Sequence, residues 1–157
     1  MRLSPALPLV LAACVSSPPD TAADRAELLR MHDMARADHL EKRADRLVSK
    51  FADSMRSVAA GRVTISPRSE TQARLQAYFD QSTFQEWDDL APPFIEISPD
   101  GRMAYKIVQK RVRLTAPDST GRTIAEDVVF AWVEIYRKPA DGWTLVAIAS
   151  TDRPGPP

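Results

Sequence analysis

The chain has 157 residues, enough for one domain of ordinary size and too few for two. Its hydrophobic content of 44% and charged content of 27% are typical of a soluble globular protein and exclude a disordered chain. With 21 basic and 21 acidic residues the formal net charge is zero, so no nucleic-acid partner is expected from charge. The single cysteine excludes an intramolecular disulfide, and with only two histidines no metal or other cofactor is expected.

The beginning of the chain has the pattern of an export signal. A positive charge at Arg2 precedes an apolar run over residues 3–13, which falls short of the roughly 20 apolar residues that span a bilayer. The run ends in Leu11-Ala12-Ala13-Cys14, which resembles the bacterial lipobox, where the cysteine is acylated and becomes the first mature residue. We therefore expect a lipid anchor on Cys14 as the only membrane attachment, in a bacterial cell envelope. The alternative is an incidental Cys14 in a secreted or periplasmic protein.

The first half of the folded part is expected to be helical. Apolar residues recur at steps of three or four from Asp24 to about Phe51, which predicts a long helix with a break near Ala37 to His39. A turn and a short strand follow over residues 59–65. Ser66-Pro67 is a helix-start signal, because a hydroxyl can cap the first turn and proline fits the first helical position. This second helix is expected to end near Gln81.

The second half is expected to form a sheet. Pro92-Pro93 excludes a helix, and the phase of the apolar residues slips near Ile107-Val108, which predicts a β-bulge there. Helices followed by hairpin-connected strands predict an α+β fold, a cone-shaped curved antiparallel sheet wrapped on N-terminal helices. The expected strands are 94–98, 103–115, 122–137 and 143–150, with turns at 98–101 and 140–142. The expected segments are a signal peptide over 1–13, a tether over 14–23, one domain over 24–152 and a disordered tail over 153–157.

Four stretches carry a family resemblance: Phe84 to Ile95, Ser98 to Tyr105, Ala131 to Tyr136, and Asp141 to Leu145. They resemble the SnoaL-like, or nuclear transport factor 2-like, superfamily. The resemblance implies a bent sheet closed by N-terminal helices, with a pocket between them. Members include isomerases, cyclases and dehydratases as well as domains that only bind or dimerise, so the fold does not give the function. The isomerases use a first-helix Tyr and an Asp base, and the first helical stretch here has no Tyr.

Two histidines are candidates for chemistry. His32 and His39 are seven residues apart, so they share one face of the first helix, which is also its apolar face. Either they contact a ligand, with His39 as a general base, or they are half-buried and bond to backbone carbonyls.

Three carboxylates interrupt the apolar strand over 122–137, namely Glu126, Asp127 and Glu134. A carboxylate inside the pocket would have a raised pKa and could serve as an acid or a base. The alternative is an ordinary place at an edge or rim. A site of the dehydratase or cyclase type would pair His39 with Glu126 or Asp127, and these three residues are the expected catalytic set.

Aromatic residues are candidates for the pocket wall. Trp87, Tyr105, Trp132 and Trp143 could form a flat apolar surface for a ring-shaped ligand, or could belong to the core. The expected ligand pocket contains His32, His39, Trp87, Tyr105 and Trp132. Asp88 and Asp89 would point opposite ways in an extended chain, so they are expected at a rim rather than as an acid/base pair.

Both faces of the strand over 122–137 are largely apolar. One face must line the cone, and the other would expose Phe130 and Trp132 unless something covers it. We therefore expect a homodimer packed through the sheet face. A monomeric mass in solution by light scattering would contradict this expectation.

These features favour an envelope-anchored scaffold or binding domain for a small hydrophobic molecule, without catalysis. The alternative is an isomerase, cyclase or dehydratase that acts on a small hydrophobic substrate by general acid/base catalysis. A third hypothesis is an interaction domain whose sheet face binds a different protein. The sequence does not identify the ligand.

Overall fold

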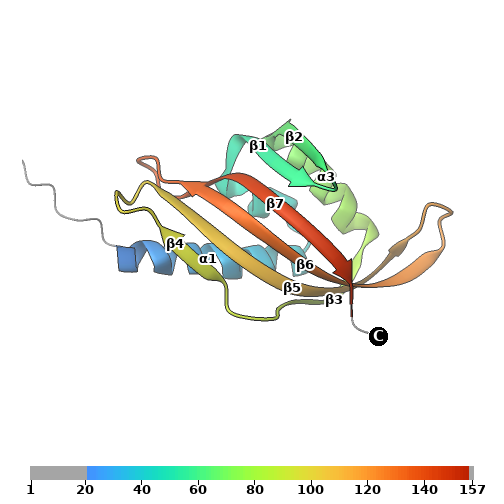
Figure 1. Cartoon of the computed structure of the whole chain (residues 1–157). Coiled ribbons are helices and arrows are strands. Elements are labelled where there is room, and N and C mark those ends of the chain that lie inside the picture. Colours follow the sequence, from blue (N-terminus) through green and yellow to red (C-terminus); the bar gives the residue numbers. More distant parts are fainter. Residues whose placement is uncertain (1–20, 156–157) are drawn as a thin grey trace, which may run out of the picture.

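The helices of this chain lie against one face of a curved sheet in the computed structural model, which describes residues 21–155 (Figure 1). The expected signal peptide, Cys14 and most of the expected tether lie outside the described residues. The helices are α1 (Thr21–Leu40), α2 (Ala44–Leu47), the 3-10 helix η1 (Val48–Lys50) and α3 (Arg68–Gln81). Within residues 21–155, no helix is both long and apolar enough to cross a membrane.

The break in the first helical segment falls at Glu41 to Arg43, slightly after the position expected at Ala37 to His39. Lys42 takes a positive φ of 58°, which ends the regular helix. The backbone N–H of Arg43 then donates to the carbonyl of Asp38 at 2.8 Å. This bond satisfies one of the last free carbonyls of α1 while the chain turns into α2.

One sheet contains all the strands of the described chain, and its order is β2-β1-β7-β6-β5-β3, with β4 paired to β5. The α+β prediction is confirmed, but the sheet is not wholly antiparallel, because β1 and β7 pair in parallel. The sequence did not indicate β1, and two residues assigned to the tail, 153 and 154, belong to β7. The strands are β1 (Phe51–Ala59), β2 (Arg62–Pro67), β3 (Thr83–Asp89), β4 (Phe94–Ile97), β5 (Met103–Pro117), β6 (Thr123–Arg137) and β7 (Thr144–Pro154).

The β-bulge expected near Ile107-Val108 is wrong. β5 pairs with β6 without a shift from Met103 opposite Arg137 to Pro117 opposite Thr123. Even-numbered residues of β5 face inward along the buried part of the strand, and this inner row contains two lysines. The inner residues of β5 are Ala104, Lys106, Val108, Lys110, Val112 and Leu114.

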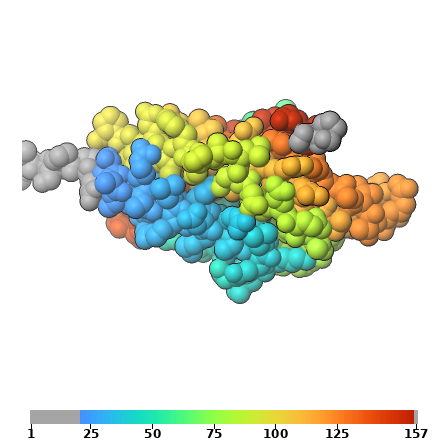
Figure 2. Space-filling model, turned by 90° about the horizontal axis from the view of Figure 1, so that it is seen from below, coloured from blue at the N-terminus to red at the C-terminus, as the bar shows by residue number. Residues whose placement is uncertain are grey.

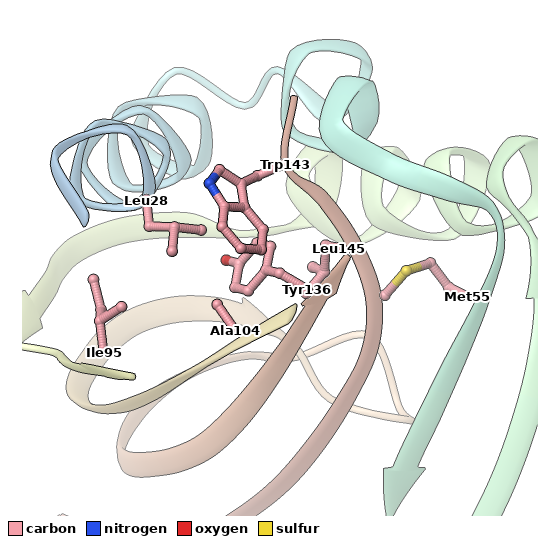
Figure 3. Packing of buried hydrophobic residues seen from close by; sticks show 7 residues of the cluster. All are labelled: Leu28, Met55, Ile95, Ala104, Tyr136, Trp143 and Leu145. Atoms are coloured by element: carbon pink, nitrogen blue, oxygen red, sulfur yellow. The ribbon is translucent and has the colours of Figure 1, made fainter. Parts of the chain in front are cut away.

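The larger core cluster joins α1 to the sheet. Leu28 of α1 packs beside Trp143 and Tyr136 at the inner face (Figure 3). The Trp143 indole N–H donates to a carboxylate oxygen of Asp24 at 3.2 Å, and the Lys138 ammonium contacts the same oxygen. This contact fixes the beginning of α1 against the hairpin that joins β6 and β7. Trp143 is therefore a core residue.

The helices cover only part of the sheet. Figure 2 shows α1, α2 and η1, in blue to cyan, across one side of the molecule, while the β5–β6 hairpin, in orange, projects beyond them. A smaller core cluster of Ala44, Leu47 and Phe79 closes the space between α2 and α3. The inner face of the sheet and the surrounding helices thus form a cone.

Candidate ligand-binding site

A cavity of about 380 Å³ lies between the helices and the inner face of the sheet. Its volume is within the range of roughly 300–1,000 Å³ that small-molecule sites occupy. Residues of α1, α2, η1, α3 and the inner rows of five strands contribute to its walls. The apolar part of the lining includes Met31, Phe51, Met55, Leu75, Trp87 and Phe130.

An aromatic wall crosses the cavity from α1 to β6. The His39 imidazole stacks on the Trp87 indole with ring centroids 3.9 Å apart and planes 16° apart. Trp87 lies in turn 6.3 Å from Trp132, centroid to centroid. These flat surfaces suit an apolar or aromatic ligand, because ring faces bury large areas with little loss of side-chain freedom.

His39 is held as a neutral imidazole. Its Nδ1 lies 2.7 Å from the carbonyl oxygen of Ala35; because a carbonyl only accepts, Nδ1 carries the proton and Nε2 is unprotonated. Burial lowers the pKa of His39 to about 4, and the Lys110 charge adds to this effect, against the opposing bond to Ala35. Within the described chain, Nε2 has no hydrogen-bond partner, so it can accept from a ligand.

The pKa of His39 predicts acid sensitivity of the fold. The unfolded imidazole takes up a proton near pH 6.5, but the folded one does so only near about 4. The free energy of unfolding is therefore unaffected by the titration of this residue above pH 6.5 and falls by about 3 kcal/mol as the pH decreases towards 4. Urea unfolding at pH 7 and pH 4.5 should show a smaller fall in the variant His39→Phe than in the wild type. An imidazole that titrates near its ordinary value by NMR would contradict the prediction.

A second histidine belongs to a buried polar group at the β3 side of the cavity. His32 Nε2 donates to Asp89 Oδ2 at 2.8 Å, and Lys110 Nζ lies 2.7 Å from Asp89 Oδ1. Within the described residues Lys110 Nζ has no hydrogen-bond partner, so its contact with Asp89 is an ion pair. Burial would raise the pKa of Asp89, but Lys110 and His32 outweigh burial and lower it. Burial lowers the pKa of His32, which is neutral at pH 7.

A second carboxylate, Glu134, is the centre of the polar group on β6. Its oxygens accept from the Trp132 indole N–H at 2.8 Å and from the Tyr136 hydroxyl. Lys106 Nζ lies 2.7 Å from Glu134 Oε2, and the two side chains are only 2% and 13% exposed. Burial, and then the Glu134 charge, raises the pKa of Tyr136 well above its ordinary value. Glu134 thus accepts two hydrogen bonds and faces one buried lysine.

Only some of the expected site residues meet in this cavity. His32, His39, Trp87 and Trp132 line it. Tyr105 does not, because odd-numbered residues of β5 face outward, and its hydroxyl donates to Glu96 at 2.7 Å on that side.

The pairing of His39 with Glu126 or Asp127 is not present. Glu126 is exposed and is not part of the cavity lining. Asp127 accepts two hydrogen bonds from the Arg111 guanidinium, at 3.0 and 2.6 Å, on the outer face. Two carboxylates do line the cavity, Glu134 and Asp38, and Asp38 pairs with Arg46.

Sequence reasoning missed Lys106 and Lys110 as residues of the inner face. The signal was present: they continue the row of every second residue that contains Val108 and Val112. A lysine in an apolar row normally argues for a change of face, since lysine is almost never fully buried unless it is paired. Here each lysine lies opposite an acid on the neighbouring strand, Lys106 opposite Glu134 and Lys110 opposite Asp89.

The dimer through the sheet face was expected because Phe130 and Trp132 would be exposed there, and the structure does not show this exposure. Phe130 and Trp132 line the cavity and are not exposed on the outer face. Other apolar side chains are exposed on strands β4, β5 and β6, and they lie on the opposite side of the sheet. These residues are Phe94, Met103, Ile107 and Ile135.

No metal site is evident in the part of the chain that the structure describes, since no three His, Cys, Asp or Glu side chains come together there. The carboxylates near the cavity instead form ion pairs with lysines, and Asp89 also pairs with His32. These carboxylates therefore act as counter-charges and hydrogen-bond acceptors.

Comparisons with known proteins identify the architecture. No family model and no curated protein matches the chain, but solved structures do. A Kribbella flavida protein superposes with a TM-score of 0.68 at 19% identity, covering 85% of this chain and 93% of the other. A candidate dehydratase of the NTF2-like family from Streptomyces avermitilis gives 0.62 at 16%, covering 88% and 100%. A ketosteroid isomerase-like protein from Erwinia carotovora atroseptica gives 0.60 at 13%, covering 85% and 96%. At such low identity the likeness shows the fold alone, which is the nuclear transport factor 2-like cone.

Proposed function

We propose that this domain binds a small, largely apolar molecule in its cone without transforming it. The observation that carries the proposal is the cavity of about 380 Å³, whose wall contains the stacked rings of His39 and Trp87. A cavity of this size with mostly apolar walls and a few fixed polar groups is the usual form of a small-molecule site.

The charges around the cavity favour binding over catalysis. A general base works best with a pKa near the operating pH, and the pKa of His39 is only about 4. The pKa of Asp89 is lowered by its partners, and Glu134 accepts two hydrogen bonds and pairs with Lys106. Neither His39 nor Asp89 is therefore in a state suited to exchange a proton at neutral pH. Asp38, the other acid of the lining, has a pKa that burial raises, and it is paired with Arg46.

An acid/base enzyme is the second candidate, because the cavity-lining His39 has a free Nε2 and some fold neighbours are described as a dehydratase or as isomerase-like. The two candidates differ in what happens to the bound molecule. Native mass spectrometry of residues 21–157 purified from cells should detect a co-purified molecule whose mass stays constant during incubation. A change with time in its mass, or for an isomerisation in the chromatographic retention of the released molecule, would favour the enzyme if the change is absent in His39→Phe.

Binding can be tested with the neutral fluorescent probe N-phenyl-1-naphthylamine. We expect the wild-type domain to bind it with micromolar affinity and a blue-shifted emission. Ser57→Phe places a ring where Ser57 lines the cavity and should weaken binding at least about tenfold, because the ring occupies volume that the probe needs. Ser54→Phe on the same strand is the matched control, since Ser54 is exposed and outside the lining. Equal binding by the two variants would contradict a site in the cone.

Attachment to the envelope through Cys14 and pairing through the outer sheet face are parts of the same proposal. Cys14 follows the lipobox-like run of the sequence, and the outer face carries exposed Phe94 and Ile107. An acyl modification found by mass spectrometry of the membrane fraction would support the anchor, and its absence from Cys14 would refute it. Light scattering of residues 21–157 tests the dimer, because a mass of two chains would support it and a monomeric mass would refute it.

A further inference from the structure

The cations around the cavity divide into paired and unpaired groups. Among residues 21–155, Arg36 pairs with Asp88 and Arg46 pairs with Asp38 and Glu41. In the interior, the Lys106 and Lys110 ammonium groups face Glu134 and Asp89. Each of these cations therefore has a carboxylate beside it.

Two further cations that line the cavity have no acidic partner in the described chain. They are Lys50, at the end of η1, and Arg74, in the middle of α3. Both side chains are exposed, whereas the lysines of β5 are buried, so Lys50 and Arg74 lie where the cavity meets solvent. Tyr78, one turn after Arg74 on α3, lines the same part of the wall.

This division decides where a negative group of a ligand would bind. A carboxylate or sulfonate brought to the interior would compete with Glu134 and Asp89 and would have to lose its hydration. At Lys50 and Arg74 it keeps part of its hydration and gains two cations that lack a counter-charge. An apolar body would then extend past Leu75 to the rings of His39 and Trp87.

We infer that the ligand class is an amphipathic organic anion, with an apolar body in the cone and one acidic group held at its opening by Lys50 and Arg74. This inference rests on the proposed binding function and specifies its ligand. It replaces the wholly hydrophobic ligand that the sequence suggests, because the opening carries two cations without partners.

Two fluorescent probes of nearly the same shape test this inference. N-phenyl-1-naphthylamine is neutral, and 1-anilinonaphthalene-8-sulfonate carries one sulfonate on the same ring system. We expect the wild-type domain to bind the sulfonate about tenfold more tightly than the neutral probe at low salt. The double variant Lys50→Gln/Arg74→Gln should lose most of this preference, measured as the ratio of the two Kd values.

A matched control separates a local site from the effect of net charge. Arg30→Gln/Arg62→Gln removes two exposed cations that do not line the cavity and should keep the preference of the wild type. An equal loss in both double variants, or no preference in the wild type while the neutral probe still binds, would overturn the inference and leave the binding function intact. Failure of both probes to bind would overturn the binding function itself.

Discussion

Replacing Glu134 with leucine is expected to lower the free energy of unfolding by about 3–5 kcal/mol. The reason is the ion pair with Lys106, whose side chain is only 2% exposed and would lose its counter-charge. The Trp132 and Tyr136 donors would lose their acceptor as well. Urea unfolding followed by circular dichroism at pH 7 measures the loss.

The double variant Lys106→Met/Glu134→Leu identifies the cause. Apolar side chains of similar size can replace a buried ion pair at little cost, so more than half of the lost stability should return. A coupling energy of about 2 kcal/mol or more between the two sites is expected, since they are in direct contact. A double variant as unstable as the sum of the two single variants would show that Lys106 is not stabilised by Glu134.

Some elements could be predicted because their signals are local. α3 begins directly after Ser66-Pro67 and ends at Gln81 as expected, but Pro67 takes the N-cap position and no side chain caps the first turn, so the capping role expected of Ser66 is wrong. Gly101 and Gly142 take φ values of 67° and 105° in the turns that were placed at these positions. Glycine adopts such angles without steric cost, so a few neighbouring residues are enough to indicate each turn.

Other elements depend on partners far along the chain. β1 has a weak apolar alternation of its own, and its parallel pairing sets Phe51 beside Leu145. The inner face of β5 was missed for the same reason, since Lys106 and Lys110 can be buried only because β6 and β3 supply Glu134 and Asp89. The spacing of apolar residues cannot reveal a pairing of this kind.

Four of the five residues expected in the pocket line it, and for the two histidines helical spacing was the signal. His32 and His39 lie seven residues apart on α1 and both line the cavity. The carboxylates could not be assigned without the strand register. Register turns Asp127 and Tyr105 outward, and it brings Glu134, which the sequence left without a partner, beside Lys106.

Asp88 and Asp89 are adjacent, yet their replacement should have very different effects. Asp89→Ala is expected to lower the free energy of unfolding by about 2–4 kcal/mol, because it leaves the buried Lys110 without its counter-charge and the His32 ring without its acceptor. Asp89 itself is 25% exposed, which places the loss below that of a fully buried pair. The sequence assigned both residues to a rim, and Asp89, at the end of β3, also accepts from His32 and faces Lys110.

Asp88→Ala is the matched control. Asp88 pairs with Arg36 and both side chains are about half exposed, so the loss should be at most about 1 kcal/mol. The sign of the pH dependence follows from the lowered pKa of Asp89. Its stabilisation is present above the unfolded pKa of roughly 3.9 and is lost as the pH falls through the lower folded value. The difference in unfolding free energy between Asp89→Ala and Asp88→Ala should therefore be largest at pH 7 and disappear at strongly acidic pH. Equal unfolding free energies at pH 7 would refute the role of Asp89 as the counter-charge of Lys110.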